Sequence, residues 1–169
     1  MTPSATDVIR SEREIRRAVE AVADPELPLI TIADLGILRA VEFVPTAGGA
    51  QVTVTITPTY SGCPAMEAIA DDVRAAATAA GATAVEIRTV LAPAWTTDWI
   101  TDTGRATLEE HGIAPPGPST GAVGLTLSVR CPQCGSLDTR ELSRFSGTAC
   151  KALHACNVCK EPFERMKAH

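Results

Sequence analysis

Cysteine is the residue type in this sequence whose number and spacing indicate a chemical role. Five of the six cysteines lie near the carboxyl end of the chain. Cys-x-x-Cys occurs there twice, at Cys131 with Cys134 and at Cys156 with Cys159. Each pair can form a tight knuckle, and a pair of knuckles can close a tetrahedral four-thiolate cage around Zn²⁺. In a reducing compartment such pairs indicate metal ligands rather than disulfides.

A cage with four protein ligands has no open position for water, so the pattern predicts a structural zinc site in a zinc ribbon. An iron–sulfur cluster is the competing occupant, because four thiolates suit it as well. Cys150 and His154 lie inside the spacer. Since the pairs already supply four ligands, we interpret Cys150 as a small buried apolar residue and His154 as a surface residue.

The sixth cysteine, Cys63, stands alone between a β-rich run and a run with helical spacing, directly before Pro64. Proline suits the first position of a helix, so we expect Cys63 at or next to the N-cap. There the helix dipole would favour a thiolate, and Gly62 would let a metal or a partner's backbone approach. A half-buried, unreactive cysteine is the alternative, and the local sequence leaves both open. The lack of an evident base counts against a nucleophile, since the histidine outside the ribbon, His111, lies in a weakly specified segment.

Carboxylates at Asp24, Glu26 and Asp34 alternate with apolar residues in "DPELPLITIADLGIL". They could support Cys63 or bind a metal together with it. Aspartate before proline or near glycine more often accepts local backbone hydrogen bonds that hold turns. Taken alone, the residues favour turns for Asp24 and Asp34.

Hydrophobic periodicity predicts the elements that position these residues. Ser11 and Glu14 form a capping box that would open a first helix. β-Branched runs at 37–44 and 51–58, with turn glycines between them, predict an antiparallel hairpin. A helix is expected at 65–80, a third strand at 84–91 and a further helix at 103–112. The order α-β-β-α-β-α indicates an α+β fold, with helices covering one face of a small mixed or antiparallel sheet.

Composition divides the chain at a segment rich in proline and glycine. We expect an α+β domain at 1–113, a linker at 114–124 and the ribbon at 125–169. Within the ribbon, short strands are expected at 125–129, 138–145 and 150–156.

Charge and hydropathy exclude some classes of function. The net charge is -5 and is unevenly distributed. The ribbon, 125–169, holds seven Lys/Arg and four Asp/Glu, whereas the body of the chain, 1–124, holds eight Lys/Arg and sixteen Asp/Glu. Such a body would be repelled by nucleic acid, and the ribbon offers only Phe145 and Phe163 for stacking on bases. No apolar run approaches the roughly 20 residues of a membrane helix, and the amino-terminal segment lacks the apolar core of a secretory signal. We therefore expect a cytoplasmic protein without nucleic-acid or membrane partners, and leave homodimerisation open.

The motifs above carry a resemblance to a known family. "DPELP" and "IADLGILRAV", followed by "VTVTITPTYSGCPAMEAI", are similar to the domain shared by MIP18-like and SufT-like iron–sulfur assembly proteins. "CPQCGS" and "FSGTACKALHACNVCKEPF" bring the chain closer to the PaaD-like branch, and the likeness spans nearly the whole sequence. At residues 145–148 the chain has Phe-Ser-Gly-Thr where that branch is expected to have Phe-Gly-Ser-Thr.

The resemblance implies an accessory role in phenylacetate catabolism, without catalytic activity of the chain alone. That role would be assembly or maturation of the iron–sulfur or di-iron centres of a phenylacetyl-CoA epoxidase. Its oxygenase and reductase subunits, or other iron–sulfur client proteins, would be the partners. A thiol-dependent enzyme acting on a CoA thioester or persulfide through Cys63 is the alternative function.

Residue roles follow from the resemblance by position. Cys63 would handle iron or a cluster transiently, beside Asp24 and Glu26. The matching residues of the supporting loop are Asp34, Gly36 and Gly62. The cysteines of the ribbon would hold structural Zn²⁺.

Overall fold

The computed structural model describes residues 5–46, 49–60, 62–117 and 128–167. The chain forms compact units at Met1–Trp95 and Thr96–His169. Within the described residues, no helix has both the length and the apolar composition needed to cross a membrane.

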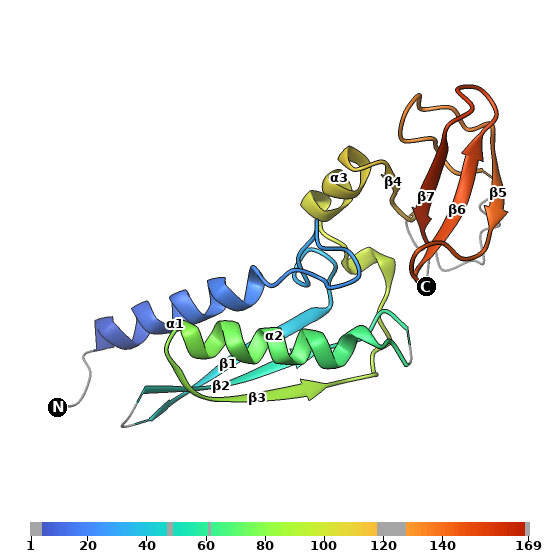
Figure 1. Cartoon of the computed structure of the whole chain (residues 1–169). Helices are drawn as coiled ribbons and strands as arrows, with labels where there is room; N and C mark the ends of the chain where they lie inside the picture. Colours follow the sequence, from blue (N-terminus) through green and yellow to red (C-terminus); the bar gives the residue numbers. More distant parts are fainter. Residues whose placement is uncertain (1–4, 47–48, 61, 118–127, 168–169) are drawn as a thin grey trace. The chain divides into compact units, whose positions relative to one another are not determined.

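The first unit begins with α1, Ala5–Glu20 (Figure 1). Its buried face carries Ile15 and Val19, as the periodicity predicts. The predicted start is wrong, because Ser11 lies inside the helix and does not cap it. Neither glycine nor proline interrupts residues 5–11, so the helix continues toward the amino terminus past that position.

The sheet of this unit confirms the predicted hairpin. β1, Leu38–Thr46, pairs antiparallel with β2, Gly49–Ile56. β3, Ala82–Thr89, pairs parallel with β2, so the described strands form a mixed sheet in the order β1-β2-β3. Val52, Val54 and Ile56 are fully buried on one face of β2, and the polar residues Gln51, Thr53 and Thr55 occupy the other, where Thr53 is also buried.

The crossover between β2 and β3 is α2, Ala65–Ala79, with Gly81 directly after its C-cap as predicted. Its buried positions are Ala65, Ile69, Val73 and Ala77. α1 and α2 contact each other and lie on one face of the sheet (Figure 1). The predicted α+β class is therefore observed.

The second unit opens with a short 3-10 helix, Thr97–Trp99, and α3, Asp102–Glu110. Its described strands are β4, Ile113–Ala114; β5, Thr139–Ser143; β6, Lys151–Cys156; and β7, Pro162–Met166, in the order β4-β7-β6-β5. β5 and β6 confirm the strands expected at 138–145 and 150–156. β7 was not predicted from the sequence, and residues 125–127 of the other expected strand lie outside the described residues.

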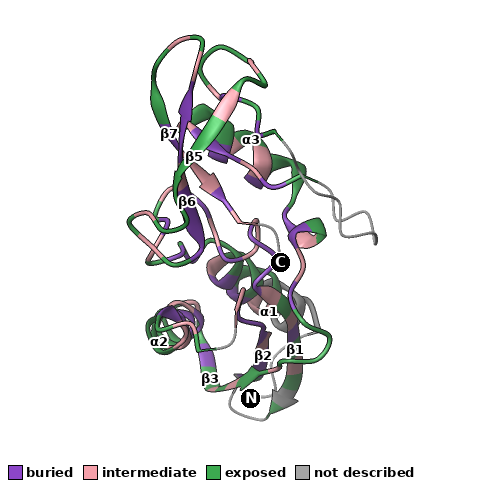
Figure 2. Ribbon diagram, turned by 90° about the vertical axis from the view of Figure 1, so that its right-hand side faces the viewer, coloured by how far each residue is buried: buried purple, intermediate pink, exposed green. Residues whose placement is uncertain are grey.

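The boundary between the units differs from the expected one at residue 113. β4 pairs with β7, so the segment that contains α3 and β4 belongs with the ribbon rather than with the first sheet. The expected linker begins in β4, Pro116 is buried, and residues 118–124 of the linker lie outside the described residues. The ribbon core consists of Ala114, Val129, Cys131, Cys156 and Phe163. Figure 2 shows buried stretches along β6 and β7.

Candidate functional site

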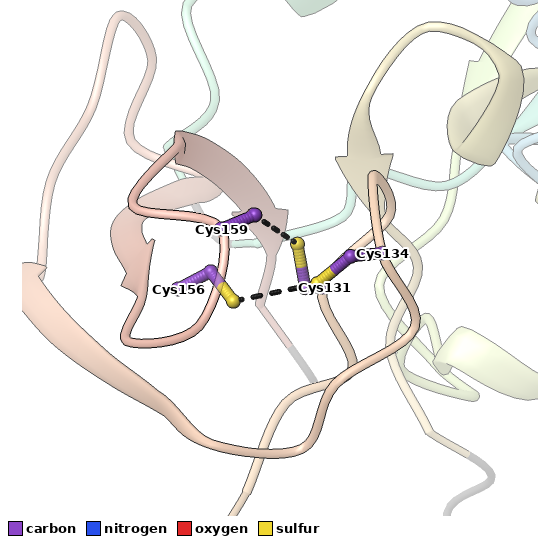
Figure 3. A group of neighbouring side chains, drawn as sticks. All are labelled: Cys131, Cys134, Cys156 and Cys159. Atoms are coloured by element: carbon purple, nitrogen blue, oxygen red, sulfur yellow. Dashed lines mark hydrogen bonds between the residues drawn. The ribbon is translucent and has the colours of Figure 1, made fainter.

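The cysteine pairs of the ribbon come together in space (Figure 3). The Sγ atoms of Cys131 and Cys159 are 3.7 Å apart, and those of Cys134 and Cys156 are 3.6 Å apart. All four Sγ atoms lie within 4.8 Å of one another. A tetrahedral ion with Zn–S bonds of about 2.3 Å places its sulfurs about 3.8 Å apart. The cluster therefore fits a single tetrahedral metal ion.

Backbone turns hold the knuckles in place. Gly135 donates its N–H to the carbonyl of Cys131 (2.9 Å) and takes a φ of 74°, a conformation suited to glycine. In the second knuckle, Val158 donates its N–H to the Sγ of Cys156 at 3.4 Å. The backbone N–H groups of Cys159 and Val158, together with the thiols of Cys134 and Cys159, lower the pKa of Cys156 to about 6, whereas hydrogen bonds with the other cluster thiols raise the pKa of Cys159. A thiolate, the form that ligates metals, is thus favoured at Cys156.

The residues between the pairs stay outside the cluster. Cys150 is buried and contacts the hydroxyl of Thr148 at 3.1 Å, which confirms its interpretation as a small buried residue. The prediction for His154 was wrong: it is 4% exposed and its ring stacks on Phe163 with a centroid distance of 5.7 Å. His154 lies on β6, opposite Phe163 and two residues before Cys156. Side chains two residues apart on a strand lie on the same face, so the ring lies on the core side of the sheet together with Cys156.

Cys63 lies next to the start of α2, as expected. It precedes the N-cap residue Pro64, and its N–H donates to the carbonyl of Tyr60 at 3.4 Å. The thiol is half-buried. Gly62 has a φ of 85° and open space around its Cα, which leaves the approach to the turn uncrowded.

Of the two interpretations that the sequence left open for Cys63, its surroundings favour the unreactive thiol over the thiolate. Burial raises the pKa of the Cys63 thiol most, and the negative charges of Glu26 and Asp24 raise it further. Hydrogen bonds from the Ala65 backbone and the Tyr60 side chain act in the opposite direction without overcoming these effects. Proximity to a helix start is therefore outweighed by desolvation and by like charge.

The acidic loop brings carboxylates close enough to act on that thiol. Asp24 is 6% exposed, and its Oδ1 accepts the N–H groups of Glu26 (2.9 Å) and Leu27 (2.8 Å). This confirms its role in holding a turn. Burial, the largest effect, also raises the pKa of Asp24. Glu26 is half-buried beside it.

Asp34 holds a second turn, as its position near glycine predicts. Its Oδ2 accepts the hydroxyl of Thr31 at 2.9 Å, and its N–H donates to that hydroxyl at 3.0 Å. Gly36 follows at a φ of 72°. The loop is tied to the segment after β3 by Trp95, whose Nε1 donates to the carbonyl of Leu35 at 2.9 Å.

Sequence reasoning missed Tyr60 and Trp95. Tyr60 hydrogen-bonds the Cys63 side chain, and the available signal was its place three residues before that cysteine as the single tyrosine of the chain. In the part of the chain that the structure describes, only the ribbon cysteines gather as a compact set of metal ligands. Cys63, Asp24 and Glu26 share an electrostatic environment rather than a preformed ligand cage.

Comparison with known proteins agrees with both units. Residues 12–88 match the family described as iron–sulfur cluster assembly protein, and residues 115–167 match the PaaD zinc beta ribbon domain. The crystal structure of a domain of unknown function, DUF59, from Bacillus anthracis superimposes with a TM-score of 0.52 at 25% identity. That likeness covers 62% of this chain and 97% of the other.

One curated relative matches this chain over most of its length. The D component of a "putative 1,2-phenylacetyl-CoA epoxidase" of Escherichia coli is 45% identical over 91% of each chain. An "Fe-S protein maturation auxiliary factor" of Porphyromonas gingivalis is 32% identical over 57% of this chain and 89% of its own. The zinc ribbon match and the cysteine cluster support metal binding by the ribbon. The chain therefore belongs to the PaaD-like family of phenylacetyl-CoA epoxidase components, which joins an iron–sulfur assembly domain of the MIP18-like type to a zinc ribbon.

Proposed function

We propose that this protein is an accessory factor of a phenylacetyl-CoA epoxidase system and matures the iron–sulfur or di-iron centres of its partners. Iron, or a small cluster, is the cargo, and Cys63 is its transient ligand. The relatives named for an epoxidase component and for Fe–S maturation support this role.

The surroundings of Cys63 are the observation that carries the proposal. Carboxylates that raise the pKa of a thiol by charge repulsion also attract a cation, and a metal displaces the thiol proton when it binds. Glu26 and Asp24 would therefore favour iron at the place where they disfavour a free thiolate. Asp24 is held in its turn, because its Oδ1 accepts the N–H groups of Glu26 and Leu27.

The same surroundings argue against an enzyme that attacks a CoA thioester or persulfide. The nucleophile of such an enzyme is the thiolate, and activation requires a base or a lowered pKa. The Cys63 pKa is raised instead, and the carboxylates beside it would repel the phosphates of CoA.

We assign Zn²⁺ to the ribbon cage, with Cys131, Cys134, Cys156 and Cys159 as its ligands. The fit to one tetrahedral ion supports this, because a cluster distributes its thiolates over several metal atoms and so holds them farther apart. Zinc there would stabilise the small ribbon core. The exposed Phe145 and Val158 make the ribbon a candidate surface for the epoxidase partners.

Cells that lack the native protein provide the test. The epoxidase oxygenase and reductase would be isolated from cells supplied with the wild-type chain, with Cys63→Ser or with Cys150→Ser. Iron content and oxygenase activity of the partners would then be measured. We expect Cys63→Ser to lower both strongly and Cys150→Ser, at a buried cysteine outside the four-cysteine cluster, to leave them unchanged.

Fully loaded partners in the presence of Cys63→Ser would contradict the role of this thiol. Turnover of phenylacetyl-CoA by the purified chain, lost in Cys63→Ser, would instead favour the enzyme. Amide hydrogen exchange of β2 and α2 that matches the wild type would show that Cys63→Ser keeps the fold of the first unit, so that a maturation defect is separate from unfolding.

A further inference from the structure

A pocket of about 530 Å³ lies on the first unit, lined by the end of α1, the 31–34 turn and the start of β1. Arg16, Arg17 and Arg39 line it, together with Glu20 and Asp34. We refer to it as the arginine pocket. Cys63 is not among its lining residues, so the inference below does not depend on the role proposed for that thiol.

Neutral groups hold one of these guanidinium groups in place. Arg16 donates from Nη2 to the carbonyl of Val41 at 2.9 Å, and its guanidinium lies 5.3 Å from the ring centroid of Phe43. A carbonyl and an aromatic face orient the guanidinium but do not cancel its charge. Arg17, one residue further along α1, makes no ion pair within the described residues.

Two arginines elsewhere in the unit, Arg74 and Arg88, are paired with acidic neighbours. Arg74 pairs with Asp71 at 2.7 Å, and Arg88 pairs with Glu86 at 3.0 Å. The unit as a whole is acidic, with seven arginines and no lysine against twelve Asp/Glu in residues 1–95. The arginine pocket therefore collects positive charge on a body that otherwise repels anions.

We propose that the arginine pocket binds a carboxylate side chain from an acidic segment of a partner protein. Arginine presents a planar fork of N–H donors that matches a carboxylate in two parallel hydrogen bonds. Three guanidinium groups against Glu20 and Asp34 leave an excess of one positive charge, which one carboxylate balances. A phosphate group carries up to about two negative charges and would leave an excess of negative charge beside Glu20 and Asp34.

The size of the pocket agrees with a segment of chain as occupant. Sites for small ligands span roughly 300–1,000 Å³, so the observed volume holds a side chain together with part of its backbone. The lining comes from a helix end, a turn and a strand, and the hydrogen bond from the Asp34 N–H to the Thr31 hydroxyl fixes that turn.

Nuclear magnetic resonance on the full chain tests this directly. The probe is a blocked peptide of alternating alanine and glutamate, added at physiological salt while the arginine Nε–H signals are followed. The same peptide with glutamine and inorganic pyrophosphate serve as the comparison ligands. Arg17→Gln removes a pocket charge, and Arg13→Gln, an exposed arginine of α1 outside the pocket, is the matched control.

The glutamate peptide should shift the signals of Arg16, Arg17 and Arg39, and the glutamine peptide should not. Arg17→Gln should weaken binding by at least about threefold, and Arg13→Gln should leave it unchanged. Equal shifts at Arg13 and Arg74, or equal weakening by both variants, would overturn the site. Tighter binding of pyrophosphate at the same signals would overturn the assignment to a carboxylate.

Discussion

Lys151 on β6 donates a hydrogen bond to Glu164 on β7 at 2.6 Å, and its side chain is 9% exposed. Glu164 lies opposite Leu153, which makes Lys151 its diagonal neighbour on the same face of the sheet. Glu164 also accepts the hydroxyl of Ser146 and the N–H of Gly147. One carboxylate thus ties a pair of strands to the turn in which this chain has Ser-Gly where the branch is expected to have Gly-Ser.

Removal of the lysine charge should destabilise the ribbon. Lys151→Met keeps most of the apolar stem but leaves the Glu164 carboxylate without its cation, which should lower the free energy of unfolding by about 2 kcal/mol. Amide hydrogen exchange of β6 and β7 is the measurement, because it reports this unit separately. The double variant Lys151→Met with Glu164→Gln should recover part of the loss. Strictly additive losses would contradict a coupled pair.

Ribbon stability should depend on acid through the same carboxylate. Burial alone would raise the pKa of Glu164, but the hydrogen bonds from Lys151 and Ser146 and the charge of Lys151 lower it. A carboxylate whose pKa is lower in the folded than in the unfolded chain stabilises the fold. The full contribution is present above the unfolded pKa, near 4.5, and is lost as the pH falls through the folded pKa. Urea unfolding below pH 5 should show this decline, and Glu164→Gln should flatten it.

Much of the fold follows from periodicity in the sequence. The hairpin, α2 and the cysteine knuckles are set by alternation, helical spacing and Cys-x-x-Cys pairs, which are local signals. β7 was missed because "PFERM" is short, starts with proline and mixes charge with apolar residues; its pairing with β6 is what makes it a strand. The assignment of α3 to the ribbon unit likewise depends on β4. That strand, Ile113–Ala114, is too short to give a periodic signal in the sequence.

The site was predictable in its ligands but not in its electrostatics. The spacing of the ribbon cysteines implied a cage, and the sulfur distances agree. The Cys63 pKa could not be read from the sequence, because Glu26 and Asp24 approach it only through the folded acidic loop. The same holds for His154, whose burial depends on the core face of β6 and on Phe163.

Removal of metal should unfold the ribbon and spare the sheet of the first unit. A chelator that extracts zinc leaves four thiolates without a cation in a core that is small, whereas the buried residues of the first unit, such as Val54 and Ile69, do not depend on the metal. Hydrogen exchange should therefore rise in β5–β7 and stay slow in β2 and α2. Cys134→Ser should reproduce the effect, and Cys150→Ser should retain zinc. Protection of β6 in the metal-free chain would contradict a structural role.

Substitutions of Glu26 and Tyr60 should change the alkylation rate of Cys63 in opposite directions. Below its pKa, the alkylation rate of a thiol follows the fraction present as thiolate. Glu26→Gln removes a charge that raises the Cys63 pKa and should accelerate alkylation, whereas Tyr60→Phe removes a hydrogen bond that lowers it and should slow alkylation, each by roughly threefold. Mass spectrometry of the Cys63 peptide after iodoacetamide treatment distinguishes this thiol from those of the ribbon. A change in the same direction for both variants would indicate altered access to the thiol rather than altered pKa. Full pH profiles would separate these causes, because access changes the plateau rate while pKa moves the midpoint.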